Sequence, residues 1–331
     1  MDEGAVMPGD HSHGDDQHAH DAHEHAHLHN HGAAGHSHAP KSFGPAFAIG
    51  MVLNTGYVVA EVIYGIAAHS LALLADAGHN LGDVLGLGAA WLAAILIKRK
   101  PTARHTYGLG GASILAALSN AVLLLVVTGA IAWEAVRRLA APEPAAGVTI
   151  MVVAAVGIAV NGITALLFAS GRKGDLNIKG AFLHMASDAL LAAGVVVAGG
   201  LILLTGWLWL DPVVSIIVSV VIVIGTWSLL RDSLNLSLNA VPAGVEQEKV
   251  QAYLGGLPGL SEVHDLHIWG LSTTDTALTA HLVVAEGADG EGLMRRLPSE
   301  LKKRFGIGHS TFQLETRETA EACALREDHV V

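Results

Sequence analysis

The sequence predicts a membrane-embedded, all-α domain of six helices followed by a small α+β domain. Three observations carry this prediction. Of the 331 residues, 51% are hydrophobic and only 15% are charged, whereas an ordinary soluble domain carries about 25% charged residues. Six apolar stretches each approach the roughly 20 residues that a bilayer-spanning helix needs. From about residue 240 onwards, the composition becomes that of a soluble domain.

Residues 1–42 precede the first apolar stretch and form a histidine-rich tail, which we expect to be disordered and cytoplasmic. The first forty residues contain eleven histidines with interspersed Asp and Glu, and no Lys or Arg. Such a low-complexity segment cannot build a packed core. Neutral imidazoles are good zinc ligands, so metal capture is the expected role, and a purification tag or solvated linker is the alternative. No basic start followed by an apolar core is present, so a cleaved signal peptide is not expected.

The predicted six-helix transmembrane domain occupies residues 43–238. Its apolar stretches run approximately over 45–68, 71–97, 111–136, 148–170, 178–205 and 211–234. Lys and Arg flank the second and fourth connections, at 98–104 and 172–179, whereas the first and fifth connections contain neither. The positive-inside rule therefore predicts that both termini are cytoplasmic, although Arg137 and Arg138 near the third connection argue the other way.

The soluble region at 239–316 shows alternating periodicities. Helical spacing at 245–257 is followed by strand-like segments at 263–271 and 277–286, a helical pattern at 289–305 and a strand-like segment at 309–316. This αββαβ order fits two helices packed on a three-stranded sheet. Residues 317–331 are expected to be a flexible tail.

Two apolar stretches contain the same pair of polar residues at the same spacing. His79 precedes Asp83 in the second, and His184 precedes Asp188 in the fifth. Residues four apart share one face of a helix. Each ionisable residue at the bilayer centre costs on the order of 2.5–3.5 kcal/mol, so these groups need partners. Two His and two carboxylates that meet between the helices would form a four-ligand site suited to tetrahedral zinc.

Further polar residues lie in the same spans. Asp76 lies three residues before His79 and could cap a helix, relay protons or line the path to the site. Glu61 in the first stretch could be a proton carrier or a structural partner. Imidazole binds metal only in its neutral form, so protons and zinc compete for such ligands. Exchange of metal against protons is therefore a hypothesis, and the spacing gives it no direction.

The soluble domain repeats ligand types on its predicted strands. His309 and Glu315 share the face of the last strand opposite Phe312 and Leu314, and His281 opposes an apolar face in the same way. Together with His264 they could form a second, solvent-facing metal site. The alternative is that they are ordinary surface residues.

Several function classes are disfavoured. The formal net charge of −11 argues against nucleic acid as a partner. A single cysteine, Cys323, excludes an internal disulfide and a multi-thiolate metal site. An intramembrane metallohydrolase needs an open coordination position and often a His-Glu-x-x-His motif, which does not occur, so we do not expect an enzyme. A metal sensor or storage protein would suit the tail alone but would not need six spans with matched ligand pairs.

The chain resembles the cation diffusion facilitators, in particular the zinc-exporting branch, over residues 43–316. The most specific segments are SLALLADAGHNLGD at 70–83, HMASD at 184–188, VHDLHIW at 263–269 and FQLE at 312–315. The resemblance implies a homodimer in a lipid bilayer with a cytoplasmic, ferredoxin-like metallochaperone domain. It also implies a secondary active transporter that exports Zn²⁺ from the cytosol in exchange for protons by alternating access.

The resemblance also assigns residues. It implies that His79, Asp83, His184 and Asp188 are the transport site, and His at position 79 is typical of the zinc-selective form. His281, His309 and Glu315 match cytoplasmic zinc ligands of the branch, and His264 matches a ligand of more distant members.

The chain departs from the family pattern at two positions, and some alternatives stay open. Gly111 and Ser113 stand where many relatives carry Arg and Glu. His105 alone is too little to predict an interfacial zinc. Cadmium, cobalt or nickel are the alternative substrates. A bacterial inner membrane is the expected location, with a vesicle membrane as the alternative.

Overall fold

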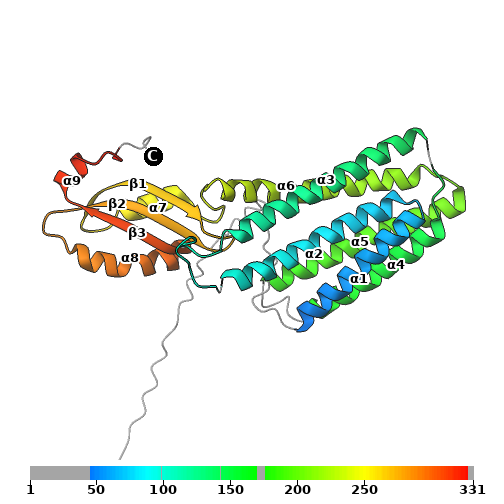
Figure 1. Cartoon of the computed structure of the whole chain (residues 1–331), viewed down its shortest axis with the longest axis horizontal. Coiled ribbons are helices and arrows are strands. Elements are labelled where there is room, and N and C mark those ends of the chain that lie inside the picture. Colours follow the sequence, from blue (N-terminus) through cyan, green and yellow to red (C-terminus); the bar gives the residue numbers. More distant parts are fainter. Residues whose placement is uncertain (1–44, 98, 142, 170–175, 327–331) are drawn as a thin grey trace, which may run out of the picture. The chain divides into compact units, whose positions relative to one another are not determined.

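The computed structural model describes residues 45–97, 99–141, 143–169 and 176–326 (Figure 1). The histidine-rich segment lies outside these residues, as does most of the fourth connection. The first part of the described chain consists of long helices: α1 (Pro45–Ala67), α2 (Leu71–Ile97), α3 (Ala112–Ala140), α4 (Gly147–Ala169), α5 (Leu176–Thr205) and α6 (Leu210–Ser237). Each helix coincides with one of the predicted apolar stretches.

Within the described residues, five of these helices are long and apolar enough to cross a membrane, namely α1, α3, α4, α5 and α6. The helix α2 is 27 residues long and is not among these five over the residues that were searched, which leave out part of its apolar second half. Its first half contains the polar residues Asp76, His79, Asn80 and Asp83. The described residues therefore support five of the six predicted spans by composition.

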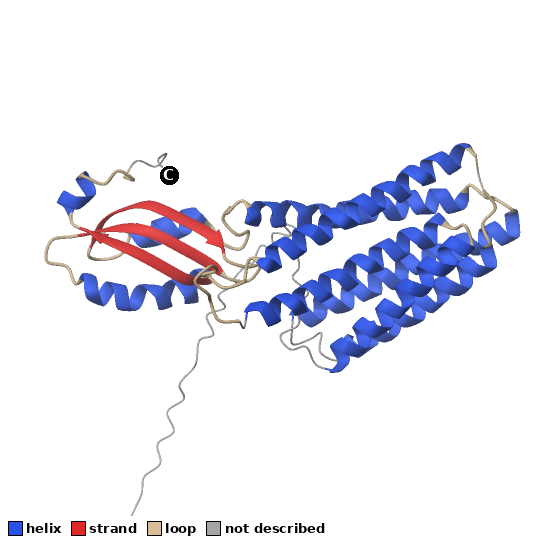
Figure 2. Ribbon diagram, viewed as in Figure 1, coloured by secondary structure: helices blue, strands red, loops and turns tan. Residues whose placement is uncertain are grey.

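The long helices pack in pairs. The helix α4 runs along α5, α3 runs along α6, and α1 packs against α2 and α4 (Figure 2). The helix α2 also contacts α3 and α6. One core between them contains Leu73, Ile150 and Val195, all essentially without solvent exposure. In α4, Gly157 leaves room for the phenol ring of Tyr57 in α1, because a Cβ atom there would lie 2.0 Å from the Tyr57 hydroxyl.

The beginning of α2 is held by the first turn of α6. The Asp211 carboxylate accepts hydrogen bonds from the Ser70 hydroxyl at 2.5 Å, the Leu71 N–H at 2.8 Å and the Ala72 N–H at 3.3 Å. The Ser70 hydroxyl also accepts from the Leu73 N–H at 3.2 Å. The first N–H groups of a helix have no partner inside the helix, and a negative charge there is favoured by the helix dipole. Asp211 therefore fixes where α2 starts.

Arg138, which argued against the predicted topology, lies within a local network. Its guanidinium donates to the His69 carbonyl at 2.7 Å and forms ion pairs with Glu134 and Glu143, each at 3.3 Å. Its charge is thus paired with one carboxylate in the last turns of α3 and one on the connection that follows.

The second part of the chain is an α+β unit with α7 (Gln247–Gly255), β1 (Leu260–Gly270), β2 (Thr276–Val284), α8 (Gly290–Phe305), β3 (Ile307–Glu315) and α9 (Arg317–Glu321). The sheet order is β1-β2-β3, with β1 antiparallel and β3 parallel to β2. Its core includes Leu254 of α7, Leu278 and Leu282 of β2, and Leu297 and Leu301 of α8. The predicted order of helices and strands is present up to β3.

The short helix α9 lies where the sequence predicted only a flexible tail. Thr316 and Thr319 form a reciprocal capping box at its start, and Ala320 is buried. A capping box pairs N–H groups that would otherwise be free at a helix start. This local pairing and the burial of one apolar residue explain why residues 317–321 are helical.

Candidate metal centres

The two His-Asp pairs of α2 and α5 meet between these helices. His79 Nε2 lies 3.1 Å from Asp188 Oδ1 and 3.8 Å from Asp83 Oδ2. His184 Nε2 lies 3.2 Å from Asp83 Oδ2 and 3.7 Å from Asp188 Oδ2. Each imidazole therefore contacts both carboxylates, and the four side chains, which we call the quartet, form a ring in which His and Asp alternate.

The quartet is set deep between the helices, but it is not sealed. The Asp188 side chain is 2% exposed, whereas those of His79, Asp83 and His184 are 18–28% exposed. Donor atoms of His79, Asp83 and Asp188 lie within 4.8 Å of one another. The His184 ring stands edge-on to the His79 ring, with centroids 5.9 Å apart. His184 Nε2 joins this group through its 3.2 Å contact with Asp83 Oδ2.

The chemistry of the quartet suits a borderline divalent cation. Two imidazole nitrogens and two carboxylate oxygens form a donor set that zinc accepts in tetrahedral geometry. Without a cation, the same imidazoles can hold protons that interact with the carboxylates. A metal ion and protons therefore compete for one set of atoms.

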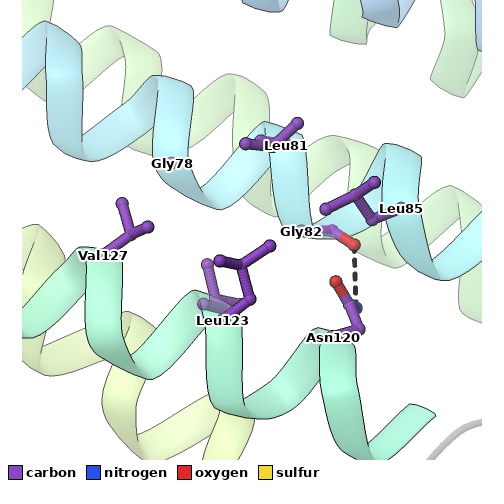
Figure 3. A pocket seen from close by; sticks show the side chains of 8 residues that line it. Gly78, Leu81, Gly82, Leu85, Asn120, Leu123 and Val127 are labelled. Carbon is purple, nitrogen blue, oxygen red and sulfur yellow. Dashed lines mark hydrogen bonds between the residues drawn. The ribbon is translucent and has the colours of Figure 1, made fainter. Parts of the chain in front are cut away.

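The neighbouring face of α2 carries glycines and packs on α3. Successive helical residues are about 100° apart, so Gly78 and Gly82 point away from the adjoining His79 and Asp83. A Cβ atom on Gly82 would lie 2.8 Å from the Leu124 side chain. A small pocket remains here (Figure 3), lined by Gly78, Leu81, Gly82, Leu85, Asn120, Leu123, Leu124 and Val127.

Asn120 is the polar group of this pocket, and its Nδ2 donates to the Gly82 carbonyl at 3.0 Å. Figure 3 shows Leu123 and Val127 directed from α3 towards α2. The pocket is mostly apolar and offers no set of metal ligands. It is a packing feature that adjoins the backbone of Asp83, a candidate ligand.

A second cluster lies on the sheet of the α+β unit. Donor atoms of His264 (β1), His281 (β2), Glu315 (β3) and Cys323 lie within 4.8 Å of one another. His281 Nδ1 lies 3.0 Å from Glu315 Oε1 and 3.5 Å from Cys323 Sγ, and His264 Nε2 lies 3.4 Å from Glu315 Oε2. His264 and Glu315 are 4–5% exposed. We call these four residues the cytoplasmic cluster.

The strand register explains this cluster. His264 and His281 are direct partners across the antiparallel β1–β2 pair, and their ring centroids are 5.1 Å apart. Directly opposed side chains on one face of a sheet are nearest neighbours. Glu315 pairs with Val283 on the other side of β2, which brings its carboxylate to His281. Three of the four predicted cytoplasmic residues are thus brought together.

His309 is the fourth predicted residue, and the structure does not bring it to the cluster. It shares a strand face with Glu315 but lies six residues earlier, and strands rise about 3.3 Å per residue, so about 20 Å separates them. His309 is exposed, and its ring packs edge-on against Tyr107 at 5.5 Å. The face alternation was therefore insufficient to predict the site, because the position along the strand also decides proximity.

Cys323 takes the place expected for His309. As the single cysteine of the sequence, it had excluded only disulfides and multi-thiolate sites. The capped helix α9 and an ion pair of Arg326 with Glu262, at 3.0 and 2.9 Å, hold the segment against the sheet. The hydrogen bond to Arg326 lowers the pKa of the Glu262 carboxyl. The capping pattern at Thr316 was the available signal that this segment is ordered.

A bulge in β1 places further polar groups beside His281. The ladder with β2 is irregular between His264 and His267, and Asp265 has a φ of 50°. The Asp265 carboxylate lies 3.3 Å from His281 Nε2 and 2.8 Å from His267 Nε2. Bulges commonly redirect side chains near functional sites. Here the bulge lets His281 contact a carboxylate on each side of its ring.

The other polar residues noted in the sequence have different structural surroundings. Among the described residues, His105 belongs to neither cluster, and its N–H donates to the Thr102 hydroxyl at 3.1 Å. Ser113, which stands where many relatives carry Glu, accepts from the Thr273 N–H at 3.0 Å. Glu61 and Asp76 are buried in the neighbouring helices α1 and α2.

The sequence was compared with known families and proteins. Residues 47–236 match the cation efflux transmembrane domain, and residues 242–317 match the cytoplasmic domain of cation efflux proteins. The cadmium, cobalt and zinc/H(+)-K(+) antiporter of Bacillus subtilis is 34% identical over 85% of this chain and 92% of its own length.

Two further relatives carry related names. The metal cation efflux system protein CzcD of Cupriavidus metallidurans is 36% identical over 88% of this chain and 93% of its own length. The zinc transporter ZitB of Escherichia coli is 34% identical over 88% of this chain and 92% of its own length.

Proposed function

Because this chain belongs to the cation efflux family of integral membrane metal transporters, we propose that it exports Zn²⁺ from the cytosol in exchange for protons. The quartet of His79, Asp83, His184 and Asp188 is the proposed transport site. The observation that carries this proposal is that each imidazole contacts carboxylates from both helices. Such a ring can hold either one divalent cation or protons.

The exchange follows from the charges of the quartet. A Zn²⁺ ion binds neutral imidazoles and ionised carboxylates, so protons held by these groups must leave as the metal enters. When the site opens to a more acidic compartment, protons return to the same groups and weaken the metal's hold. The proton gradient then supplies the direction that the site itself lacks. Alternating access between the two sides completes the cycle.

Zinc is the preferred substrate because of the nitrogen donors. Manganese and magnesium favour oxygen ligands, whereas imidazole suits zinc and its neighbours in the transition series. The printed names of the relatives include cadmium and cobalt as well as zinc. Cadmium, cobalt and nickel are therefore the alternative substrates of the same mechanism. A membrane metal sensor or storage protein is the alternative of a different class, and it predicts binding without flux.

The proposed arrangement places all six long helices in the membrane and both termini in the cytoplasm, where the loop charges favour them. The bacterial origin of the relatives named above supports the inner membrane as the location. The cytoplasmic α+β domain is proposed to pair two copies of the chain in a homodimer. The cytoplasmic cluster supplies two imidazoles, a carboxylate and a thiol, a donor set that suits a regulatory zinc ion.

Zinc binding by the purified chain, measured by equilibrium dialysis, tests this assignment. The native chain should bind zinc in preference to manganese. The Asp83→Ala, Asp188→Ala double variant should lose the membrane site and keep binding at the cytoplasmic cluster. Unchanged zinc stoichiometry in this double variant would move the transport site elsewhere. Substituting the partly buried Asp232 of α6, which pairs with Arg231, by Ala is the matched control, because it removes a carboxylate that belongs to neither cluster.

A further inference from the structure

We propose that the carboxyl groups of Glu61 on α1 and Asp76 on α2 form a shared proton-binding site, which releases its proton when the metal binds the quartet. This inference rests on the proposed function, because it concerns protons exchanged for metal. It assigns to two residues outside the quartet a part in that exchange. The two residues are called the carboxyl pair below.

The carboxyl pair is fully enclosed. Glu61 has no solvent exposure and Asp76 is 2% exposed. Asn80, whose side chain contacts Glu61, lies one turn after Asp76 on the same face of α2, so Asp76 and Glu61 face one another between α1 and α2. Buried carboxyl groups are costly unless they are paired or neutral. Two of them side by side therefore call for an explanation.

The surroundings do not neutralise two negative charges. Asn80 Nδ2 donates to Glu61 Oε2 at 3.0 Å, but among the described residues no donor satisfies the buried Glu61 Oε1. The sequences of α1, α2 and α4 contain no Lys or Arg. The titratable groups that face the pair are Tyr57 of α1, His79 and Asp83 of α2, and Asp188 of α5.

Two carboxylates in contact within a low-dielectric interior cannot both be ionised, so the pair retains one proton. The proton bridges one oxygen of each residue and titrates as a property of the pair. Among the described residues, Glu61 Oε1 has no hydrogen-bond donor within bonding geometry, so it can accept the proton of that bridge. The pair then carries one net negative charge instead of two.

The quartet can act on this proton through charge. Asp76 lies three residues before His79 on α2, about one helical turn away. A divalent cation held by the quartet favours ionised carboxylates nearby, and the low dielectric of the interior transmits this effect. The shared O–H bond then breaks, its electron pair stays on the carboxylate oxygen, and the proton passes to water. Two carboxylates then remain, about one helical turn from the bound cation, whose positive charge favours their ionised form.

The alternative is that Glu61 and Asp76 only hold α1 against α2. The two possibilities differ in the number of protons released per metal ion. By linkage, log Kd for zinc falls with rising pH, and the magnitude of its slope equals that number. A structural pair contributes nothing to the slope, whereas a proton-binding pair contributes up to one.

Zinc titrations of the full-length chain across a pH series measure this slope. The slope should fall by up to one proton per zinc in Glu61→Gln and in Asp76→Asn, and stay at the native value in Asn161→Ala, which alters a buried polar residue of α4. Equal slopes in all four proteins would overturn the role of the pair. A native chain that releases no protons at all would instead overturn the proposed antiport.

Infrared spectroscopy provides a second measurement that does not depend on metal binding. In the Asp83→Asn, Asp188→Asn background the quartet holds no carboxylates, so a protonated buried carboxyl band at neutral pH reports on other groups. We expect this band to be present and to disappear when Glu61→Gln is added. Its absence from the background variant would overturn the proposal even if the Glu61 variant fails to fold.

Discussion

His79 Nε2 on α2 lies 3.1 Å from Asp188 Oδ1 on α5, closer than the 3.8 Å that separates it from Asp83 on its own helix. His184 shows the same preference, since its nearer carboxylate, at 3.2 Å, is also on the opposite helix. The quartet is therefore an interhelical arrangement. Its ability to hold a cation depends on how α2 and α5 face one another.

Replacing the imidazole at position 79 should change the choice of metal. His79→Asp substitutes an oxygen donor for a nitrogen donor, and oxygen ligands suit harder cations such as Mn²⁺. We expect the preference for zinc over manganese to fall by about tenfold or more, equivalent to about 1.4 kcal/mol. Competition between the two metals in a transport assay measures this change. An unaltered preference would show that position 79 does not set selectivity.

The cap between α6 and α2 should contribute measurably to stability. Asp211→Ala removes the acceptor for Ser70, Leu71 and Ala72 and leaves buried donors unpaired, which should cost about 1–2 kcal/mol. Thermal unfolding in detergent should show a lower midpoint. Asp232→Ala, near the other end of α6, should leave the midpoint unchanged. Equal midpoints in both variants would contradict the capping role.

The structure includes Cys323 and His281 in the cytoplasmic cluster and leaves His309 out of it, a distinction that the sequence alone did not give. Cys323→Ser and His281→Ala should each weaken zinc binding at this site, because each removes a donor within 4.8 Å of the others. His309→Ala should leave it unchanged, since His309 packs on Tyr107 instead. Zinc titration in the Asp83→Ala, Asp188→Ala background isolates this site. A larger effect from His309 than from Cys323 would contradict the geometry.

Acid should release the segment that carries Cys323. The Glu262 pKa is lowered by its hydrogen bond to Arg326. A lowered pKa in the folded state gives stability that is present above the unfolded pKa of a Glu side chain and is lost as the pH falls through the lowered value. Hydrogen exchange of residues 317–326, corrected for intrinsic rates, should therefore show protection at neutral pH that declines in acid.

Arg326→Ala is the matched variant for that experiment. It should show weak protection already at neutral pH, and the native chain should converge on it in acid. The ion pair is exposed, so the expected effect is local and confined to the segment around α9. Protection that is identical in both proteins at neutral pH would show that α9 and its capping box hold the segment without Arg326.

Much of the architecture could be predicted from the sequence because it depends on local patterns. Apolar length set the six helices, and the change in periodicity gave the order of strands and helices up to β3. The quartet was predictable because His79 with Asp83 and His184 with Asp188 repeat one spacing. These signals require only neighbouring residues along the chain.

The remaining features depend on contacts between distant segments. The capping role of Asp211 could not be predicted, because it requires α6 to lie at the start of α2. Cys323 could not be assigned to the cytoplasmic cluster, because that requires α9 to fold back onto the sheet. His309 shows the opposite case, where a correct strand face still left the residue about 20 Å from its expected partners.

The most direct test is zinc and proton flux in proteoliposomes that carry a pH gradient, comparing the native chain with Asp83→Ala and Asp188→Ala, and with Asp232→Ala as control. Zinc movement coupled to opposite proton movement is expected in the native and control proteins, and neither movement is expected in the quartet variants. Undiminished coupled flux in Asp83→Ala or Asp188→Ala would contradict transport through the quartet. Zinc binding without flux in the native chain would favour a sensor or storage protein.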